Sequence, residues 1–174
     1  MITLKKAKAQ EPSVDEPSEP PPDAIRAEGL GRRFGRTWVV RDLDLEVPLG
    51  SVTALLGRNG IGKSTTIQVL LGLLPASEGR VRILGQDPSK LGSELFQEVG
   101  YVSEKRELLE DQSVSGLARI VTEIYGQRFD TDRFEELRKR FELAPKARCK
   151  NLSKGQRARL LLALAIAARP KLLV

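Results

Sequence analysis

The fold of this chain is decided by one stretch of eight residues, Gly57-Arg58-Asn59-Gly60-Ile61-Gly62-Lys63-Ser64. This stretch matches the pattern G-x-x-x-x-G-K-[ST], and it lies between an expected strand at residues 52–56 and an expected helix at residues 63–74. Glycines let the backbone turn its N–H groups inward and approach an anion closely. The sequence therefore predicts a phosphate-binding loop that joins a buried strand to a helix.

Two side chains at the end of this loop carry the expected chemistry. Lys63 is placed to reach the β- and γ-phosphates of a nucleotide, and the hydroxyl of Ser64 is placed to coordinate Mg²⁺. The start of the helix adds unpaired N–H donors and the positive end of its dipole. The alternative is a glycine-rich turn with an exposed lysine, but a chance match to the pattern occurs on the order of once per hundred such chains.

Around the loop, hydrophobic spacing predicts strands alternating with helices. Residues 42–47 alternate polar and apolar, which predicts a strand with Leu43, Leu45 and Val47 facing inward. Further short strands are expected at 81–84, 100–102 and from 170 onward, and further helices at 113–126, 131–143 and 154–169. This order favours an α/β fold with a mainly parallel sheet and a helix-rich insert at about residues 105–150.

The first 24 residues have a different composition. They hold five of the ten prolines, five acidic residues and none of the 15 glycines, which predicts a disordered tail. Residues 25–174, the expected domain, carry 26 basic and 18 acidic residues, a net charge of +8. Such a charge suits nucleic acid or an anionic membrane, but the basic residues are scattered and aromatic residues are few, so a polyphosphate ligand explains it equally well.

Composition excludes several kinds of chemistry. The 174 residues contain no histidine and one cysteine, Cys149, which excludes a disulfide framework, a multi-cysteine zinc site and a histidine base. The longest apolar run, Leu160–Ala168, has nine residues, whereas a membrane span needs about 20. We therefore expect a protein of the reducing cytoplasm.

A second segment lies about 90 residues after the loop and opens the last expected helix: Leu152-Ser153-Lys154-Gly155-Gln156. The pairing of a phosphate loop with this segment resembles the ATP-binding cassette (ABC) ATPases, whose signature is LSGGQ. Lys154 replaces a signature glycine, as in exporter-type members. An ordinary helix N-cap is the alternative for Ser153. Phe34 resembles the family's adenine-stacking aromatic, with a core or hairpin aromatic as the alternative.

The resemblance covers residues 25–174 and implies a phosphate-loop α/β core with an N-terminal antiparallel β flap and a helical insert, incomplete at the C-terminus. It implies ATP and Mg²⁺ as cofactors. It also implies that two such domains, identical or different, dimerise head to tail, so that each ATP lies between one phosphate loop and the partner's signature. The implied nucleotide-binding residues are Phe34, Gly57, Asn59, Gly60, Gly62, Lys63, Ser64, Thr65, Ser153, Gly155 and Gln156.

Glu104 stands where the family usually has a glutamine that contacts Mg²⁺ and the attacking water. The resemblance implies a catalytic role for Lys63 and Glu104 and a metal-binding role for Ser64 and Glu104, and this glutamate also favours an exporter. The family's Walker B Asp and Glu and its switch histidine are absent. We therefore expect an N-terminal fragment of low stability that binds nucleotide weakly and does not hydrolyse ATP at a family-like rate.

The implied role of the longer protein is an ATPase subunit that powers a membrane permease, peripheral on the cytoplasmic face of the plasma membrane and without direct contact to nucleic acid. Three alternatives stay open. One is a soluble ABC ATPase that acts on the ribosome or nucleic acid, and another is a non-hydrolysing nucleotide-binding remnant. The third is a kinase or GTPase, although the sequence has no Asn-Lys-x-Asp segment to read guanine.

Overall fold

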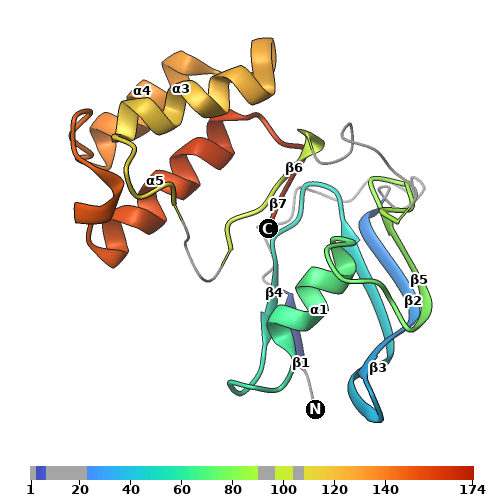
Figure 1. Cartoon of the computed structure of the whole chain (residues 1–174). Coiled ribbons are helices and arrows are strands. Elements are labelled where there is room, and N and C mark those ends of the chain that lie inside the picture. The colour runs from blue at the N-terminus through green and yellow to red at the C-terminus, as the bar shows by residue number, and fades with distance from the viewer. Residues whose placement is uncertain (1–2, 7–22, 90–96, 104–107) are drawn as a thin grey trace. The chain divides into compact units, whose positions relative to one another are not determined.

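The structure, a computed structural model, describes residues 3–6, 23–89, 97–103 and 108–174. The chain divides into two compact units, residues 1–91 and residues 92–174 (Figure 1). The expected domain of residues 25–174 is therefore divided at residue 91. Of the helices in the described ranges, none has the length and apolar character needed to cross a membrane.

The first unit contains a three-stranded antiparallel sheet in the order β3-β2-β5, which is the expected β flap. Its strands are β2 (Asp23–Phe34), β3 (Thr37–Pro48) and β5 (Glu78–Ile83). Residues that face each other across the strands lie on one side of the sheet, and this side is apolar and buried: Ile25, Ala27, Leu45, Val47, Val81 and Ile83. The inward orientation predicted for Leu45 and Val47 is confirmed.

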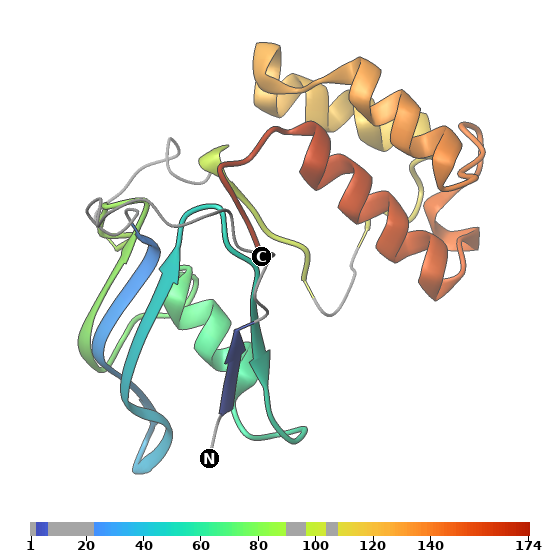
Figure 2. The ribbon, with the colours of Figure 1, turned by 180° about the vertical axis from the view of Figure 1, so that it is seen from behind.

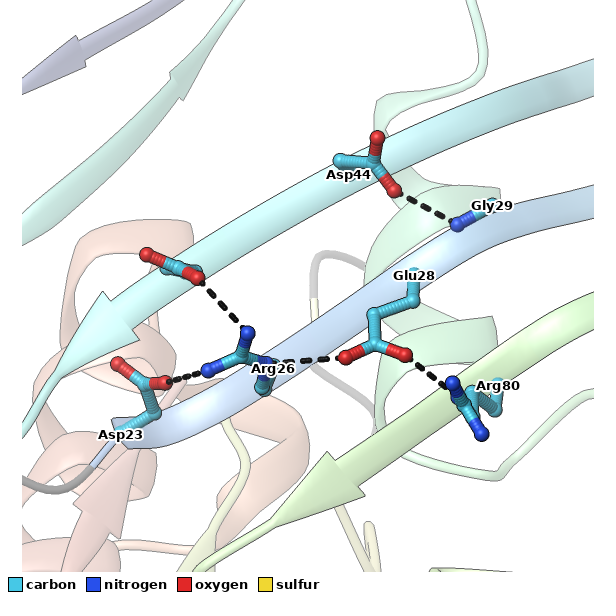
Figure 3. A network of polar contacts seen from close by, with 7 residues as sticks. Asp23, Arg26, Glu28, Gly29, Asp44 and Arg80 are labelled. Atoms are coloured by element: carbon cyan, nitrogen blue, oxygen red, sulfur yellow. Dashed lines mark hydrogen bonds and ion pairs between the residues drawn. The ribbon is translucent and has the colours of Figure 1, made fainter.

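The opposite side of the flap carries a network of ion pairs (Figure 3). Arg26 on β2 contacts Asp23, Glu28 and Glu46, and Arg80 on β5 contacts Glu28. The hydrogen bonds from Arg80 and Arg26 lower the pKa of Glu28. Because these side chains are exposed to solvent, the network contributes little to stability and mainly keeps charges of opposite sign in register across the strands.

Helix α1 (Lys63–Leu70) covers the start of the predicted helix at residues 63–74 but ends earlier. Leu71 is its C-cap, and Gly72 follows with a φ of +70°. A Cβ on Gly72 would lie 2.8 Å from the Cβ of Pro88, so the chain turns away where only glycine fits. The left-handed conformation of Gly72 therefore ends the helix, and the close approach of Pro88 leaves room only for glycine at this position.

Strand β4 (Thr53–Leu56), which precedes the phosphate loop, differs from its prediction as a buried strand. Val52 is 76% exposed and Leu56 is 44% exposed. The partner of β4 is β1 (Thr3–Lys6), which pairs with it antiparallel. These four residues lie within the segment expected to be disordered, and they form a strand paired with β4 instead. Residues 7–22 of the same segment lie outside the described residues.

The second unit is a cluster of three helices with a short parallel strand pair. The helices are α3 (Val114–Tyr125), α4 (Thr131–Arg140) and α5 (Lys154–Ala167), with 3₁₀ turns η1 (Gly126–Arg128) and η2 (Cys149–Asn151). Their apolar faces enclose a core in which the largest fully buried side chains are Phe134, Leu143, Leu160, Val114 and Cys149. The predicted helices at 113–126, 131–143 and 154–169 are confirmed, with α4 ending three residues early.

The strand pair consists of β6 (Val99–Gly100) and β7 (Leu172–Leu173), side by side in Figures 1 and 2. The three helices form the crossover between them, as parallel strands require. Among the described strands this is the one parallel pairing, so the expectation of a mainly parallel sheet differs from the structure. The difference lies in the flap and in the pairing of β1 with β4, which are antiparallel.

Asp130 joins the two ends of this helical cluster. Its side chain accepts a hydrogen bond from the backbone N–H of Arg133 at 2.9 Å, which caps α4, and another from Nη2 of Arg169, beyond α5, at 2.6 Å. These bonds favour the ionised carboxylate and lower the pKa of Asp130. Asp130 therefore stabilises the second unit in its charged form.

Replacing Asp130 with alanine should lower the thermal unfolding midpoint of the second unit at neutral pH. Because the folded-state pKa is lowered, this stabilisation is fully present above the ordinary value of about 3.9 and is lost as the pH falls through the lower folded value. Circular dichroism melts of the wild type and D130A at pH 7 and pH 3 measure the effect. D132A, which removes a charge from the same helical turn, is the control. Equal midpoints for D130A and the wild type at pH 7 would contradict the role.

Candidate functional site

The phosphate loop joins β4 to α1 and is closed by Gly62. Gly60 and Gly62 have φ values of +80° and +103°. A Cβ on Gly62 would lie 2.8 Å from Cγ1 and 3.0 Å from the carbonyl oxygen of Val39 on β3. Glycine is therefore required at position 62 both by its backbone conformation and by the close approach of the loop to the flap.

The start of α1 presents backbone donors rather than a side-chain cap. Gly62 is its N-cap and supplies no side-chain hydrogen bond, and the first turn contains no acidic residue. Thr66, which is fully buried, donates from its hydroxyl to the carbonyl of Gly62 at 2.9 Å and fixes this junction. The N-terminal end of α1 is thus built to accept an anion, because its N–H groups and dipole face the loop.

Lys63 lies across the loop. Its Nζ donates to the carbonyls of Gly57 and Arg58, each at 2.9 Å. An ammonium group has three donors, so one remains for a phosphate oxygen. Asn59 and Ser64 are exposed and Thr65 is half-buried, which leaves the rim of the loop accessible.

Phe34 lies at the end of β2, where the β2–β3 hairpin turns. Its side chain is 48% exposed, and it pairs across the hairpin with Thr37. Thr37 lies on the same strand as Val39, the residue that Gly62 approaches. The separation of two positions between Thr37 and Val39 corresponds to about 7 Å along an extended chain. Figures 1 and 2 show the hairpin turn and the loop before α1 at the same end of the first unit.

The segment Leu152–Gln156 is brought together by a capping box at the start of α5. The Oγ of Ser153 accepts from the backbone N–H of Gln156 at 3.2 Å, and the side chain of Gln156 accepts from the backbone N–H of Ser153 at 3.0 Å. Gly155 and Lys154 are exposed beside it. The N-cap reading of Ser153 is confirmed, and its nucleotide role stays a prediction.

Arg157 holds the segment that leads into this capping box. Its guanidinium donates to the carbonyls of Leu152 and Lys150 at 3.3 and 3.1 Å, and it lies 3.7 Å from a carboxylate oxygen of Glu110. The capped start of α5 is therefore fastened to the turn that precedes α3. This role of Arg157 was not predicted, because the contacts join residues far apart in the sequence.

Of the other predicted site residues, Glu104 lies outside the described residues. Within the described ranges, no three acidic, histidine or cysteine side chains gather into a group that could hold a metal ion. Sequence reasoning also missed Val39 and Thr66. Thr66 could have been found from the sequence, because it is the second threonine directly after the loop pattern. The contact of Val39 with Gly62 could not, because the two residues are far apart in the sequence.

Comparison with known proteins agrees with this geometry. Residues 40–174 match the family model described as ABC transporter. The chain is 34% identical over 169 residues to the methionine import ATP-binding protein MetN of Rhizobium etli, covering 90% of this chain and 47% of that protein. It is 34% identical over 157 residues to the probable sulfate/thiosulfate import ATP-binding protein CysA of Chlorella vulgaris, covering 87% and 65%.

Among solved structures, the chain resembles CbiO1 from Clostridium perfringens, described as part of the ABC transporter complex CbiONQ. The TM-score is 0.68 at 26% identity, covering 87% of this chain and 64% of that one. The expected α/β phosphate-loop fold is thereby confirmed. The chain spans less than two thirds of the length of each of these three relatives.

Replacing Gly62 with alanine should weaken nucleotide binding by more than about tenfold. A side chain at this φ costs roughly 1–2 kcal/mol, and about 1.4 kcal/mol is tenfold in affinity; the contact with Val39 adds to this cost. Calorimetric titration with ATP measures the loss. G50A is the control, because Gly50 has a φ of +72° and open space around its Cβ but lies outside the loop. A G62A protein that binds ATP like the wild type would refute the assignment.

Proposed function

Because this chain belongs to the ABC transporter family, we propose that it binds Mg²⁺-ATP at its phosphate loop and serves as the ATP-binding subunit of a membrane transporter. The observation that carries the proposal is the loop itself. Gly62, the N-cap of α1, lies against the flap and supplies no side-chain hydrogen bond to the helix start, and Nζ of Lys63 bridges the loop carbonyls with one donor left over. This arrangement recognises a polyphosphate through backbone N–H groups and one ammonium group.

In the proposed complex, the loop backbone at Gly57, Asn59, Gly60 and Gly62 surrounds the phosphates, and Lys63 contacts the β- and γ-phosphates. Phe34 stacks on the base. Ser64 and Thr65 follow Lys63 on the first turn of α1, where their hydroxyls lie beside the phosphates.

The residues present fit a magnesium ion. Ser64 is exposed at the start of α1 and offers a hard oxygen ligand, and Mg²⁺ is commonly held by one or two protein oxygens together with phosphates and waters. When bound, the ion would neutralise charge on the phosphate oxygens. Glu104 is proposed as a second oxygen ligand, with the catalytic role that the family resemblance assigns to it.

The capped start of α5 is proposed to act on a second ATPase domain. Ser153, Gly155 and Gln156 are presented at the N-terminal end of a helix, where a hydroxyl and backbone N–H groups favour the γ-phosphate of a nucleotide bound by the partner. Lys154, which is exposed beside Ser153, adds positive charge at this helix start.

We further propose an importer. The relatives reported above are named as import proteins or as part of a transporter complex, and the exporter direction expected from Lys154 and Glu104 finds no support in them. They equally do not favour a ribosome- or nucleic-acid-directed ATPase. The partner is then a membrane permease, which would hold the chain at the cytoplasmic face of the membrane.

ABC ATPases hydrolyse ATP, but the residues of this chain favour binding without rapid turnover. Residues 143–174, which carry the segment Leu152–Gln156, contain no aspartate or glutamate. Turnover at a family-like rate needs a carboxylate that polarises the attacking water, and residues 143–174 supply none.

The central test is a titration of the 174-residue chain with Mg²⁺-ATP, together with a phosphate-release assay. We expect saturable binding that K63A weakens by at least about tenfold, since a charge-assisted contact is worth roughly 1.5–3 kcal/mol, and no turnover above the background of K63A. K139A removes an exposed lysine of α4 as the control and should bind like the wild type. Absent binding would refute the proposal, and turnover abolished by K63A would refute the claim that the chain only binds.

A further inference from the structure

The turn of the β2–β3 hairpin concentrates positive charge around two aromatic rings. Residues 30–41 contain four arginines and no acidic residue: Arg32, Arg33, Arg36 and Arg41. Within the described residues, none of these four guanidiniums forms an ion pair with a carboxylate. Their positive charge is therefore not neutralised by a carboxylate of the described residues.

The two rings differ in how they are covered. Trp38 is half-buried, with the guanidiniums of Arg33 and Arg41 each 5.6 Å from its ring centroid. It also packs closely on the backbone, since a Cβ on Gly31 would lie 2.9 Å from its ring. Phe34 has one guanidinium against it, that of Arg32 at 4.5 Å, and nearly half of its side chain is exposed. Phe34 is thus the ring with room for a further stacking partner.

Arg32 is held in place by a hydrogen bond to a distant segment of the first unit. Its Nη1 donates to the carbonyl of Pro75 at 2.9 Å, in the turn that follows α1. Its Nε is buried and makes no hydrogen bond to any described residue. A buried donor without a partner is unfavourable, so the packing of Arg32 against Phe34 and Pro75 is maintained despite that cost.

Neighbouring contacts make this support rigid. Ser77 donates from its backbone to the carbonyl of Gly31 at 2.7 Å, and its hydroxyl accepts from the backbone N–H of Arg33 at 3.2 Å. The strand that carries Arg32 is therefore fastened on both sides of Arg32 to the connection between α1 and β5. A ring packed on such a guanidinium loses little freedom when a ligand stacks on it.

We propose that Arg32 is a positioning residue for base recognition: it covers one face of the Phe34 ring and holds the ring so that its other face receives the base of a bound nucleotide. The inference rests on the proposed ATP binding. The guanidinium also interacts with the ring electrons. The phosphates, by contrast, are bound by the loop and Lys63, so Arg32 contributes to the base-dependent part of the affinity alone.

The test compares ATP with inorganic tripolyphosphate, which has the phosphates but no base, by calorimetric titration of the 174-residue chain. R32M should weaken ATP binding by about tenfold, the scale of a lost stacking contact, and should change tripolyphosphate binding by less than about twofold. R32K keeps the cation but loses the planar fork and should restore part of the ATP affinity. R36M is the matched control, because Arg36 lies in the same turn, carries the same charge and makes no ring contact or hydrogen bond within the described residues.

A double-mutant cycle separates positioning from general structural damage. F34A should lose the base-dependent affinity, and R32M should add almost nothing to F34A if Arg32 acts through that ring. Equal weakening of both ligands by R32M, or full additivity with F34A, would overturn the inference. So would an R32M protein with unchanged ATP affinity, while the proposed function would stand. A wild-type chain that binds neither ligand would instead overturn the proposed function.

Discussion

The contact between Gly62 and Val39 is the constraint on which the first unit depends. One residue closes the phosphate loop, caps α1 and touches the flap, and its backbone conformation is one that other residues rarely adopt. Thr66 fixes the same residue from inside the helix. A side chain at position 62 would therefore separate α1 from the sheet and also spoil the anion site, so fold and function share one steric condition.

Arginine side chains repeatedly fasten loops in both units by donating to backbone carbonyls. Arg32 reaches Pro75, Arg138 reaches Leu143, and Arg148 reaches Asp111, each at 2.7–2.9 Å. A guanidinium suits this task because it offers several donors in a fixed plane. Part of the positive charge of the chain is thus structural, which agrees with the scattered distribution of its basic residues better than a surface for nucleic acid would.

Local patterns predicted much of this structure. The loop pattern and the apolar spacing of α3, α4 and α5 are local features, each contained in a short stretch of sequence. The capping box is local as well, because Ser153 and Gln156 are three residues apart. Sequence could not reveal the partner of β4, because an apolar run of that length does not specify which strand pairs with it. It could not reveal Val39 beside Gly62 or Pro75 beside Arg32 either, since those contacts arise only when distant segments pack.

The complete burial of Cys149 gives the chain a built-in reporter. It is the one cysteine of the sequence, it lies in the core of the second unit, and burial raises the pKa of its thiol. The thiolate that reacts with alkylating reagents is therefore scarce until the core opens. The rate at which this single sulfur is labelled thus measures how often the core of the helical cluster opens.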